Sequence, residues 1–414
     1  MKLKIPYDNN TVEVDFPDDT VIIESKKPAI KNDELIREKI FANFQEYKKL
    51  LRDDKVTIIV NDATRRLPTS KILKILWDHL PTRSIEILIA TGTHRAPSDA
   101  DLDIILGDLR GVFADKIFAH DCYDNCCLVK LGETSRGTAV TINRKLHESK
   151  NVICINSVEP HFFAGYTGGR KSLIPGLAGF GTIVQNHGNA KSEFAKSLSL
   201  DKNPVHLDLE EAVGFIKDKN IFSIQLVTSR GGEIVDIFPG DLEKTFKNAC
   251  TKAREVYAVD IERNYDIVFA VGEPPLDISL YQMQKAQEHG AEAVADGGIL
   301  VVVGACNEGA GSPYYVKLAE EYSKPEMALS DKTLLDNRFG IHKLVKSARR
   351  LLNQHIKLWY VTKVDDNTVR KVYYEPKRSL NVALGDALDI LGRNARVAIL
   401  RDACFTVPVN ISRF

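Results

Sequence analysis

Short apolar runs alternate along the chain with stretches in which apolar residues recur every three or four positions. The run "VTIIVND" (residues 56–62) predicts a buried strand that ends in an aspartate. The stretch "TSKILKILWDHL" (residues 69–80) predicts an amphipathic helix with Thr69 or Ser70 as its N-cap. The run "SIEILIATGTH" (residues 84–94) predicts the next strand. Strands that alternate with helices in this way are typical of an α/β protein with substantial parallel sheet.

A third strand of the same kind is expected in "NVICINSVEPHFFAGYTGG" (residues 151–169). All three expected strands end in polar loops, and ligands of open α/β sheets bind beyond the carboxyl ends of the strands. These loops carry Asp62 with Arg65, then His94, and then His161 with Lys171. We therefore expect these five side chains to converge on one crevice.

The strand–helix pattern restarts near residue 263. Strands are expected in "YDIVFAVGEPP" and "GGILVVVGACNEGAG", with a helix around residues 280–291 between them, and again in "IKLWYVTKV" and "VAILRD". A chain of 414 residues also exceeds the size at which a single hydrophobic core stops growing.

We therefore predict a two-domain α/β fold with mainly parallel or mixed sheets flanked by helices. The first domain would span residues 1–262 and the second, smaller domain residues 263–414. The last strand, in "CFTVPV", could pack on either domain. The active site would lie in the crevice between the two domains.

Charge and hydropathy narrow the class of protein. Lys+Arg and Asp+Glu both number 56, so the formal net charge is zero. Nucleic-acid and membrane-surface binding both depend on excess basic charge, so neither partner is expected. The chain shows no apolar run of about 18 residues and no signal-peptide pattern at its start. We expect a cytoplasmic protein that acts on a small molecule.

The seven cysteines are odd in number and scattered through apolar runs, which is typical of reduced thiols in a cytosolic protein. Their only cluster is Cys122, Cys126 and Cys127, which lacks the second cysteine pair of a zinc site. We therefore expect no metal at that cluster.

The glycine-rich run "HFFAGYTGGRKSLIPGLAG" (residues 161–179) carries the strongest ligand signal. It matches neither the G-x-x-x-x-G-K-[ST] nor the G-x-G-x-x-G nucleotide motif. The backbone N–H groups of Gly168 and Gly169, with the side chains of Arg170 and Lys171 near an expected helix start, suit a phosphate or a carboxylate. Without such a ligand the run would be a tight turn with solvated basic residues.

Three of the ten histidines lie in polar loops at strand or helix ends: His94 in "TGTHRAP", His161 in "EPHFFAG" and His187 in "QNHGNA". Each has an ordinary structural alternative. His94 could cap a loop, His161 could be a core histidine bonded to backbone, and His187 could cap a helix C-terminus. Their shared position at element ends favours a common site.

Two further stretches carry candidate binding groups. In "NDATRRLP", Arg65 could bind a carboxylate with its fork, and Asp62 could orient a base or a lysine. In "YQMQKAQEHG", Gln282 and Lys285 share one face of the expected helix, beside Tyr281. The alternatives are a capping aspartate with an exposed arginine, and a solvated helix face.

Taken together, these segments resemble the nickel-dependent lactate racemase family of 2-hydroxyacid racemases and epimerases. Their order and approximate spacing agree with the family over most of the chain, including the separations of ten residues from His161 to Lys171 and sixteen from Lys171 to His187. The matching motifs are D-x-x-R (Asp62, Arg65), T-G-T-H-R (His94), E-P-H-x-x-x-G-Y-x-G-G-R-K (His161, Lys171), N-H (His187) and Y-Q-x-x-K (Tyr281, Gln282, Lys285).

The resemblance implies a nickel-pincer nucleotide, a pyridinium mononucleotide that holds nickel through one carbon and two sulfurs. Lys171 would be its thioamide tether in a first, cofactor-binding domain, and His187 would be the fourth ligand of a square-planar nickel. Gly168, Gly169 and Arg170 would surround the cofactor. Separate enzymes make this nucleotide, so they are implied as partners for loading.

The resemblance also implies the reaction. A histidine would take the hydroxyl proton of a 2-hydroxy acid while hydride leaves C2 for the pyridinium, and hydride would return to either face of the 2-keto acid. Two bases are needed because the hydroxyl lies on different sides in the two enantiomers, and His94 and His161 fit those roles. The substrate-binding roles would fall to Arg65, Lys285, Gln282, Tyr281 and Asp62.

One stretch departs from the lactate racemases of the family, which carry a tryptophan in a D-Q-W context in the second domain. The corresponding stretch here, "LDNRFGIHKL", has Arg338 and Phe339 instead. Arg338 facing the pocket would indicate a second carboxylate or a polyhydroxylated tail on the substrate. The substrates left open are lactate, malate, a longer aliphatic or aryl 2-hydroxy acid, and an aldonate.

Two other classes of function compete with this interpretation. A nicotinamide-dependent oxidoreductase is disfavoured, because no G-x-G-x-x-G follows an expected strand with an acidic residue about 20 positions later. A non-catalytic α/β ligand-binding protein would carry no covalent adduct at Lys171 and no metal.

Overall fold

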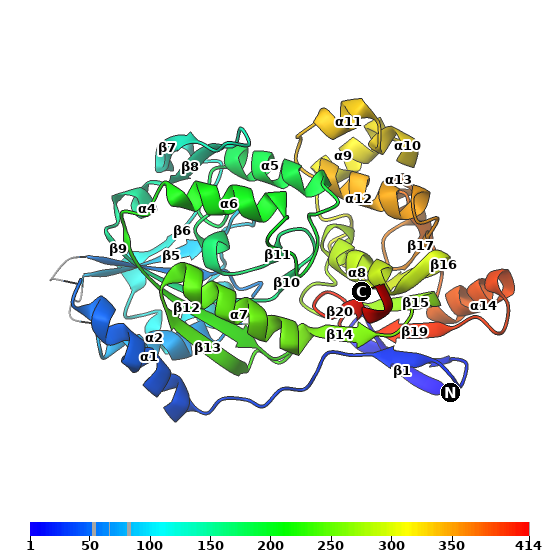
Figure 1. Ribbon diagram of the computed structural model, residues 1–414, viewed down its shortest axis with the longest axis horizontal. Coiled ribbons are helices and arrows are strands. Elements are labelled where there is room, and N and C mark those ends of the chain that lie inside the picture. The colour runs from blue at the N-terminus through cyan, green and yellow to red at the C-terminus, as the bar shows by residue number, and fades with distance from the viewer. Residues whose placement is uncertain (52–54, 66, 81–83, 414) are drawn as a thin grey trace.

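The computed structural model describes residues 1–51, 55–65, 67–80 and 84–413. Within these ranges, two six-stranded sheets flanked by helices form two α/β domains that lie side by side (Figure 1). The predicted two-domain α/β architecture is therefore confirmed. No helix in the described ranges is long and apolar enough to cross a membrane.

The first sheet has the order β13-β12-β9-β4-β5-β6 and is parallel except for β13. Alternate side chains of β4 enter opposite cores, since Ile58 packs with helices on one face and Ile59 on the other. The strands are β4 (Val56–Asn61), β5 (Ile85–Ala90), β6 (Ile117–Ala119), β9 (Asn151–Ser157), β12 (Asn220–Thr228) and β13 (Ile234–Gly240).

Helices cover both faces of this sheet. One face packs against α1 (Asp33–Lys48), α2 (Thr69–Trp77) and α3 (Asp99–Leu106). The other packs against α5 (Phe180–Gly188) and α6 (Pro204–Gly214), while α7 (Leu242–Tyr257) covers β12 and β13. The helix expected over residues 69–80 ends earlier, and its N-cap position is Pro68, without a side-chain cap.

The second sheet is parallel throughout, in the order β18-β17-β16-β15-β19-β3. One face packs against α8 (Leu280–Ala293), α9 (Pro313–Glu321) and α12 (Ile341–Leu352), and the other against α14 (Leu380–Leu391). The strands are β3 (Val21–Ile23), β15 (Tyr265–Val271), β16 (Val294–Val303), β17 (Lys357–Val361), β18 (Glu375–Pro376) and β19 (Val397–Leu400).

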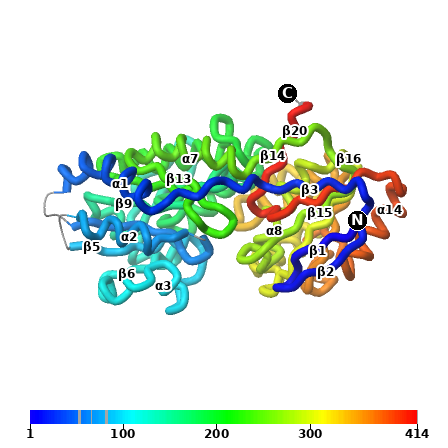
Figure 2. The backbone as a smooth tube through the Cα atoms, turned by 90° about the horizontal axis from the view of Figure 1, so that it is seen from below, coloured from blue at the N-terminus to red at the C-terminus, as the bar shows by residue number. Residues whose placement is uncertain are grey.

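The expected division of the chain at residue 262 needs a correction. The hairpin of β1 (Lys2–Tyr7) and β2 (Asn10–Asp15) packs on the second domain, where the Phe16 ring lies 5.1 Å from that of Phe269. Strand β3 then pairs with β19 at the edge of the second sheet. Figure 2 shows this N-terminal segment running along the second domain before it crosses to α1. The chain therefore begins in the second domain.

The last predicted strand lies at the junction of the domains. Strand β20 (Val407–Asn410) pairs in parallel with β14 (Ala258–Ile261), the segment that leads from the first domain into the second. The C-terminal end of the chain thus lies beside the segment that joins the two domains, and α8 packs directly against β20.

Candidate functional site

A cavity of about 150 Å³ lies at the carboxyl end of the first sheet, beyond β4, β5 and β9. The loops after these strands meet there because the three strands are parallel neighbours. The expected convergence is therefore observed, although the roles of the residues stay predictions. The predicted side chains and glycine in its wall are Asp62, Arg65, His94, His161, Gly168, Lys171 and His187.

His94 and Asp62 form a hydrogen-bonded pair in the cavity wall. His94 Nδ1 lies 2.5 Å from Asp62 Oδ2, and the hydroxyl of Thr64 donates to Asp62 Oδ1 at 2.6 Å. Burial raises the pKa of Asp62, but the hydrogen bonds from His94 and Thr64 outweigh it and hold the pKa below its usual value. An ionised Asp62 accepts from Nδ1–H, which leaves the lone pair of His94 on Nε2. His94 is thereby arranged as a base.

His161 is buried in an aromatic setting. Its ring stacks on Phe162 with centroids 5.3 Å apart and meets Phe163 edge-on at 4.5 Å. Burial, followed by the charges of Lys171 and Lys285, lowers the pKa of His161 well below its ordinary value, so the imidazole is neutral. Its Nδ1 accepts from the N–H of Ala164 at 3.3 Å.

Lys171 lies partly buried in the cavity wall, in the 3₁₀ turn Gly169–Ser172 rather than at the start of an α-helix. Burial, followed by the charges of Arg65 and Arg170, lowers its pKa well below that of an ordinary lysine. Among the described residues, no carboxylate lies within 4 Å of its Nζ, which instead lies 5.6 Å from the centre of the Phe163 ring. The surroundings of the amine therefore favour its unprotonated, nucleophilic form.

The loop before Lys171 is fixed from behind. Gly168 and Gly169 have φ of 73° and 53°, and a Cβ on Gly168 would meet Ser157 O at 2.7 Å. Arg170 faces away from the cavity: its Nη2 donates to Ala164 O at 3.0 Å, and its guanidinium lies 4.5 Å from the Phe246 ring centre. Arg170 does not line the cavity and supports the loop, and its predicted cofactor-binding role stays a prediction.

His187 lies in the last turn of α5, with its ring centre 4.9 Å from that of Phe163. Burial, followed by the charges of Lys171 and Lys343, lowers the pKa of His187 to about 3. The imidazole is therefore neutral at physiological pH, which is the form that ligates metals.

The second domain supplies Lys285 from α8. Burial, followed by the charge of Arg65, lowers the pKa of Lys285 to about 8. Arg65 Nη1 in turn lies 3.3 Å from Glu159 Oε2. Lys285 is not in the wall of the 150 Å³ cavity, so its place beside the substrate stays a prediction.

Tyr281 and Gln282 lie in the first turn of α8, which Ser279 caps by accepting from the N–H of Gln282. The Tyr281 ring stacks on Phe339 with centroids 6.0 Å apart, and Phe339 in turn contacts Phe180 of the first domain at 5.5 Å. The aromatic residue at the position of the missing tryptophan therefore lies at the domain interface.

Arg338 does not reach this site. Its guanidinium binds Glu321 at 2.7 and 2.9 Å and Asp336 at 2.7 Å, and about half of its side chain is exposed. The expected substrate-binding role of Arg338 is therefore wrong in this arrangement, because two carboxylates of its own domain already satisfy the fork. Arg338 therefore gives no reason to expect a second carboxylate on the substrate.

We expect Arg338→Ala to change kcat/KM less than twofold and to lower the free energy of unfolding by at most about 1 kcal/mol, since exposed ion pairs contribute little. Arg65→Ala is the matched control and should lower kcat/KM about 100-fold, because it removes a charged carboxylate donor. Steady-state kinetics and urea unfolding check both values. A large rise in KM for Arg338→Ala would restore its assignment.

Several side chains around the cavity were not predicted from the sequence. Glu159 pairs with Arg65, and the rings of Phe162 and Phe163 border His161. His342 and Lys343 lie behind them at the start of α12. All five stand in motifs quoted above, "EPHFF" and "FGIHK", so proximity to the assigned residues was the available signal.

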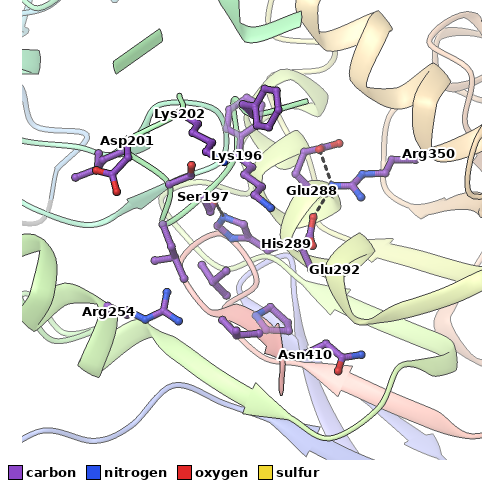
Figure 3. A pocket seen from close by; sticks show the side chains of 18 residues that line it. Lys196, Ser197, Asp201, Lys202, Arg254, Glu288, His289, Glu292, Arg350 and Asn410 are labelled. Carbon is purple, nitrogen blue, oxygen red and sulfur yellow. Dashed lines mark hydrogen bonds and ion pairs between the residues drawn. The ribbon is translucent and has the colours of Figure 1, made fainter. Parts of the chain in front are cut away.

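A larger cleft of about 580 Å³ lies between the domains and is drawn in Figure 3. In it, Ser197 of the first domain is hydrogen-bonded to His289 Nε2 of the second at 2.8 Å, and Arg350 lies between Glu288 and Glu292. The cleft touches the site only through Phe162, and its wall contains none of the predicted catalytic side chains. It is therefore not the predicted site.

Comparison with known proteins agrees with this geometry. The lactate racemase N-terminal domain model matches residues 7–197, and the lactate racemase C-terminal domain model matches residues 259–407. The chain belongs to the lactate racemase family. Its relatives include the lactate racemase of Thermoanaerobacterium thermosaccharolyticum, 27% identical over 97% of each chain. Another is the lactate racemase of Lactiplantibacillus plantarum, 28% identical over 84% of this chain and 83% of that one.

Comparison with solved structures shows that the similarity includes the fold. The lactate racemase apoprotein from Thermoanaerobacterium thermosaccharolyticum matches with a TM-score of 0.88 at 25% identity, over 99% of this chain and 100% of that chain. A protein from Thermotoga maritima matches with a TM-score of 0.70 at 18% identity, over 92% of this chain and 100% of that chain. Family membership confirms the predicted enzyme class, an isomerase of the racemase type.

Proposed function

We propose that the protein is a racemase or epimerase of a 2-hydroxy acid and that it works with a nickel-pincer nucleotide attached to Lys171. The observation that carries this proposal is the presence of Lys171, His187, His94 and His161 in the wall of one small cavity. The names of its relatives support lactate as one candidate substrate. The partners it requires are a small 2-hydroxy acid and the enzymes that make the nucleotide.

The residues of the cavity suit such a cofactor. An unprotonated lysine amine can be acylated, and the surroundings of Lys171 favour that form. A neutral imidazole is a good nickel ligand, and His187 is held in that form beside it. When bound, a nickel-pincer nucleotide supplies an acceptor for hydride from C2 and a donor that returns it to either face of the 2-keto acid.

The side chains of the two domains would hold the substrate between them. Arg65 keeps guanidinium nitrogens beyond the one near Glu159, so its fork can bind a carboxylate together with Lys285. His94 would take the hydroxyl proton at Nε2, and Asp62 would stabilise the imidazolium that forms.

His161 would serve the other enantiomer. In its present hydrogen bond, Nδ1 accepts from Ala164 N–H, so Nε2 carries the proton of the neutral ring. Proton transfer to Nε2 therefore requires the ring to give up this contact of 3.3 Å and move its proton to Nδ1. That exchange leaves the buried Ala164 N–H without its acceptor, at a cost of about 1–3 kcal/mol.

The pKa of Lys285 predicts a pH dependence of substrate capture. Burial lowers this pKa from the ordinary lysine value to about 8, so the ammonium form persists below that pH and the amine replaces it above. We expect kcat/KM to fall about tenfold for each pH unit above about 8. Lys285→Arg should flatten this limb, because arginine stays charged. An unchanged limb in the arginine variant would remove Lys285 from carboxylate binding.

The proposed function is tested on chain co-expressed with the cofactor-synthesis enzymes. Intact-protein mass spectrometry with nickel quantification should give an increment that maps to Lys171 and about one nickel per chain. Chiral analysis over a panel of 2-hydroxy acids then names the substrate. An unmodified, nickel-free chain from cells that load a known lactate racemase would overturn the proposal in favour of a non-catalytic ligand-binding protein.

A further inference from the structure

A buried carboxylate pairs with the arginine of the cavity wall. Glu159 is 5% exposed, and its Oε2 lies 3.3 Å from Nη1 of Arg65, which lines the cavity. Among the residues that the structure describes, it is the one carboxylate within 4 Å of the Arg65 guanidinium. The carboxylate of Asp62, in the same loop as Arg65, accepts from His94 and Thr64 instead. Arg65 therefore connects Glu159 to the cavity.

The backbone of Glu159 is fixed by hydrogen bonds. Its N–H donates to Thr167 Oγ1 at 2.9 Å, and the N–H of Thr167 donates to Glu159 O at 2.8 Å. These bonds extend the antiparallel pairing of β10 (Pro160–His161) with β11 (Gly165–Tyr166) by one residue pair. The candidate base His161 belongs to the same hairpin. The hairpin therefore holds Glu159 in a fixed position relative to His161.

A second arginine near Glu159 is already paired with other carboxylates. Glu159 and Arg230 both line a small cavity of about 20 Å³ between the domains. The guanidinium of Arg230 forms ion pairs with Glu24 at 2.8 Å, with Asp402 at 3.0 Å and with Glu273. The carboxylate of Glu159 is therefore left to the arginine of the site.

The single contact with Glu159 restrains the guanidinium of Arg65 and leaves donors for a ligand. A guanidinium has five N–H donors, and Glu159 accepts from one of its nitrogens. A free arginine side chain loses about 2 kcal/mol of rotamer entropy when a ligand fixes it, and a partner that restrains it beforehand lowers that cost. In a 2-hydroxy acid the carboxylate carbon is bonded to the carbon that bears the hydroxyl. A carboxylate donor tied to the hairpin of His161 therefore helps to place that hydroxyl beside the base.

We propose that Glu159 is a positioning residue, which holds the Arg65 guanidinium in place to bind the substrate carboxylate. This inference rests on the proposed function, in which Arg65 binds that carboxylate. Glu159 is not in the wall of the cavity, so it acts through Arg65 and transfers no proton to or from the substrate. Its contribution is to the binding of the carboxylate, which keeps its charge throughout the reaction.

The first test measures KM and kcat of the loaded enzyme with lactate. Glu159→Ala should raise KM about tenfold and change kcat less than about threefold, because the carboxylate contact is equally strong in the ground state and the transition state. Glu159→Gln should keep KM within about twofold of wild type, since its amide oxygen still accepts from Nη1 of Arg65. Glu86→Ala is the matched control: Glu86 is a buried carboxylate near the start of β5 that pairs with Lys55 at 2.6 Å, and its loss should leave KM unchanged.

A double-mutant cycle tests whether Glu159 acts through Arg65. In the Arg65→Ala background, Glu159→Ala should raise KM no further, because the side chain that it positions is absent. Effects of the two substitutions that multiply would overturn the inference. A lower KM in Glu159→Ala alone would also overturn it, because Glu159 would then compete with the substrate for Arg65.

Thermal unfolding of the unloaded chain separates this inference from the proposed function. Lactate should raise the melting temperature of wild type and of Glu159→Gln, and Glu159→Ala should need about ten times more lactate for the same rise. If lactate affected wild type and Glu159→Ala equally, the inference would be wrong whether or not the loaded enzyme racemises lactate. A chain that shows the expected difference but acquires no adduct at Lys171 would overturn the proposed function alone.

Discussion

Lys171→Met is expected to abolish cofactor attachment and racemase activity while making the unloaded protein more stable. The methionine keeps the aliphatic stem of the side chain and removes the amine, which is the only group that could be acylated at this position. Intact mass spectrometry after co-expression with the cofactor-synthesis enzymes should show no increment, and chiral analysis no interconversion.

The gain in stability follows from the setting of the lysine. Lys171 is partly buried, and no carboxylate of the described residues lies within 4 Å of its Nζ. Removal of a buried polar group without a partner should raise the free energy of unfolding by about 1–3 kcal/mol. Lys202→Ala, at an exposed lysine, is the control and should change this free energy by less than about 0.5 kcal/mol. Urea unfolding of the unloaded chains provides the comparison.

The lowered pKa of Lys171 determines how the gain in stability from Lys171→Met depends on pH. The folded-state pKa of Lys171 lies well below the unfolded value, so between the two values the unfolded chain binds the proton and the folded chain does not. Lys171 therefore does not reduce the free energy of unfolding above the ordinary lysine pKa. It reduces this free energy progressively as the pH falls below that value. Wild-type stability should rise with pH between 7 and 10, and the rise should be smaller in Lys171→Met. A variant that is less stable than wild type across this range would contradict the assignment of a strained, neutral lysine.

The strand-end loops of the first domain could be predicted from the sequence because their geometry follows from local patterns. Parallel strands place their carboxyl ends at one edge of a sheet, and apolar runs mark the strands, so Asp62, His94 and His161 had to lie near one another. The pattern did not give the order of the strands, and the convergence depends on β4 pairing with both β5 and β9. Contacts between individual side chains, such as the hydrogen bond between His94 and Asp62, add only short-range detail to this arrangement of the loops.

The parts that sequence reasoning missed depend on contacts distant in the chain. Strand β3 is three residues long, and its partner β19 lies more than 370 residues later, so no local signal assigns the N-terminus to the second domain. Arg338 was predicted to face the pocket because the sequence does not show that Glu321 of α9 pairs with it. Lys343 shows the opposite error, since a lysine in a helix is normally solvated and only packing against Phe162 and Tyr281 buries it.

Substitution of either candidate base should produce an enzyme that oxidises one enantiomer only. His94→Ala and His161→Ala should each lower interconversion by about 10²- to 10⁴-fold, the usual contribution of a general base, and should leave the Lys171 adduct in place. At equilibrium the two directions must fall together, so steady-state rates do not distinguish the bases. A single turnover of the loaded enzyme does, because only the first proton transfer is then needed.

In that experiment each variant is mixed with one pure enantiomer, quenched, and assayed for the 2-keto acid. His94→Ala should form keto acid from one enantiomer and His161→Ala from the other. Asp62→Asn should impair the same enantiomer as His94→Ala, but less severely, because the imidazole remains while its charged partner at 2.5 Å is lost. His206→Ala is a suitable control, since that histidine does not line the cavity and its loss should affect the two enantiomers equally. If both base variants lost the same enantiomer, the assignment of one base to each enantiomer would be wrong.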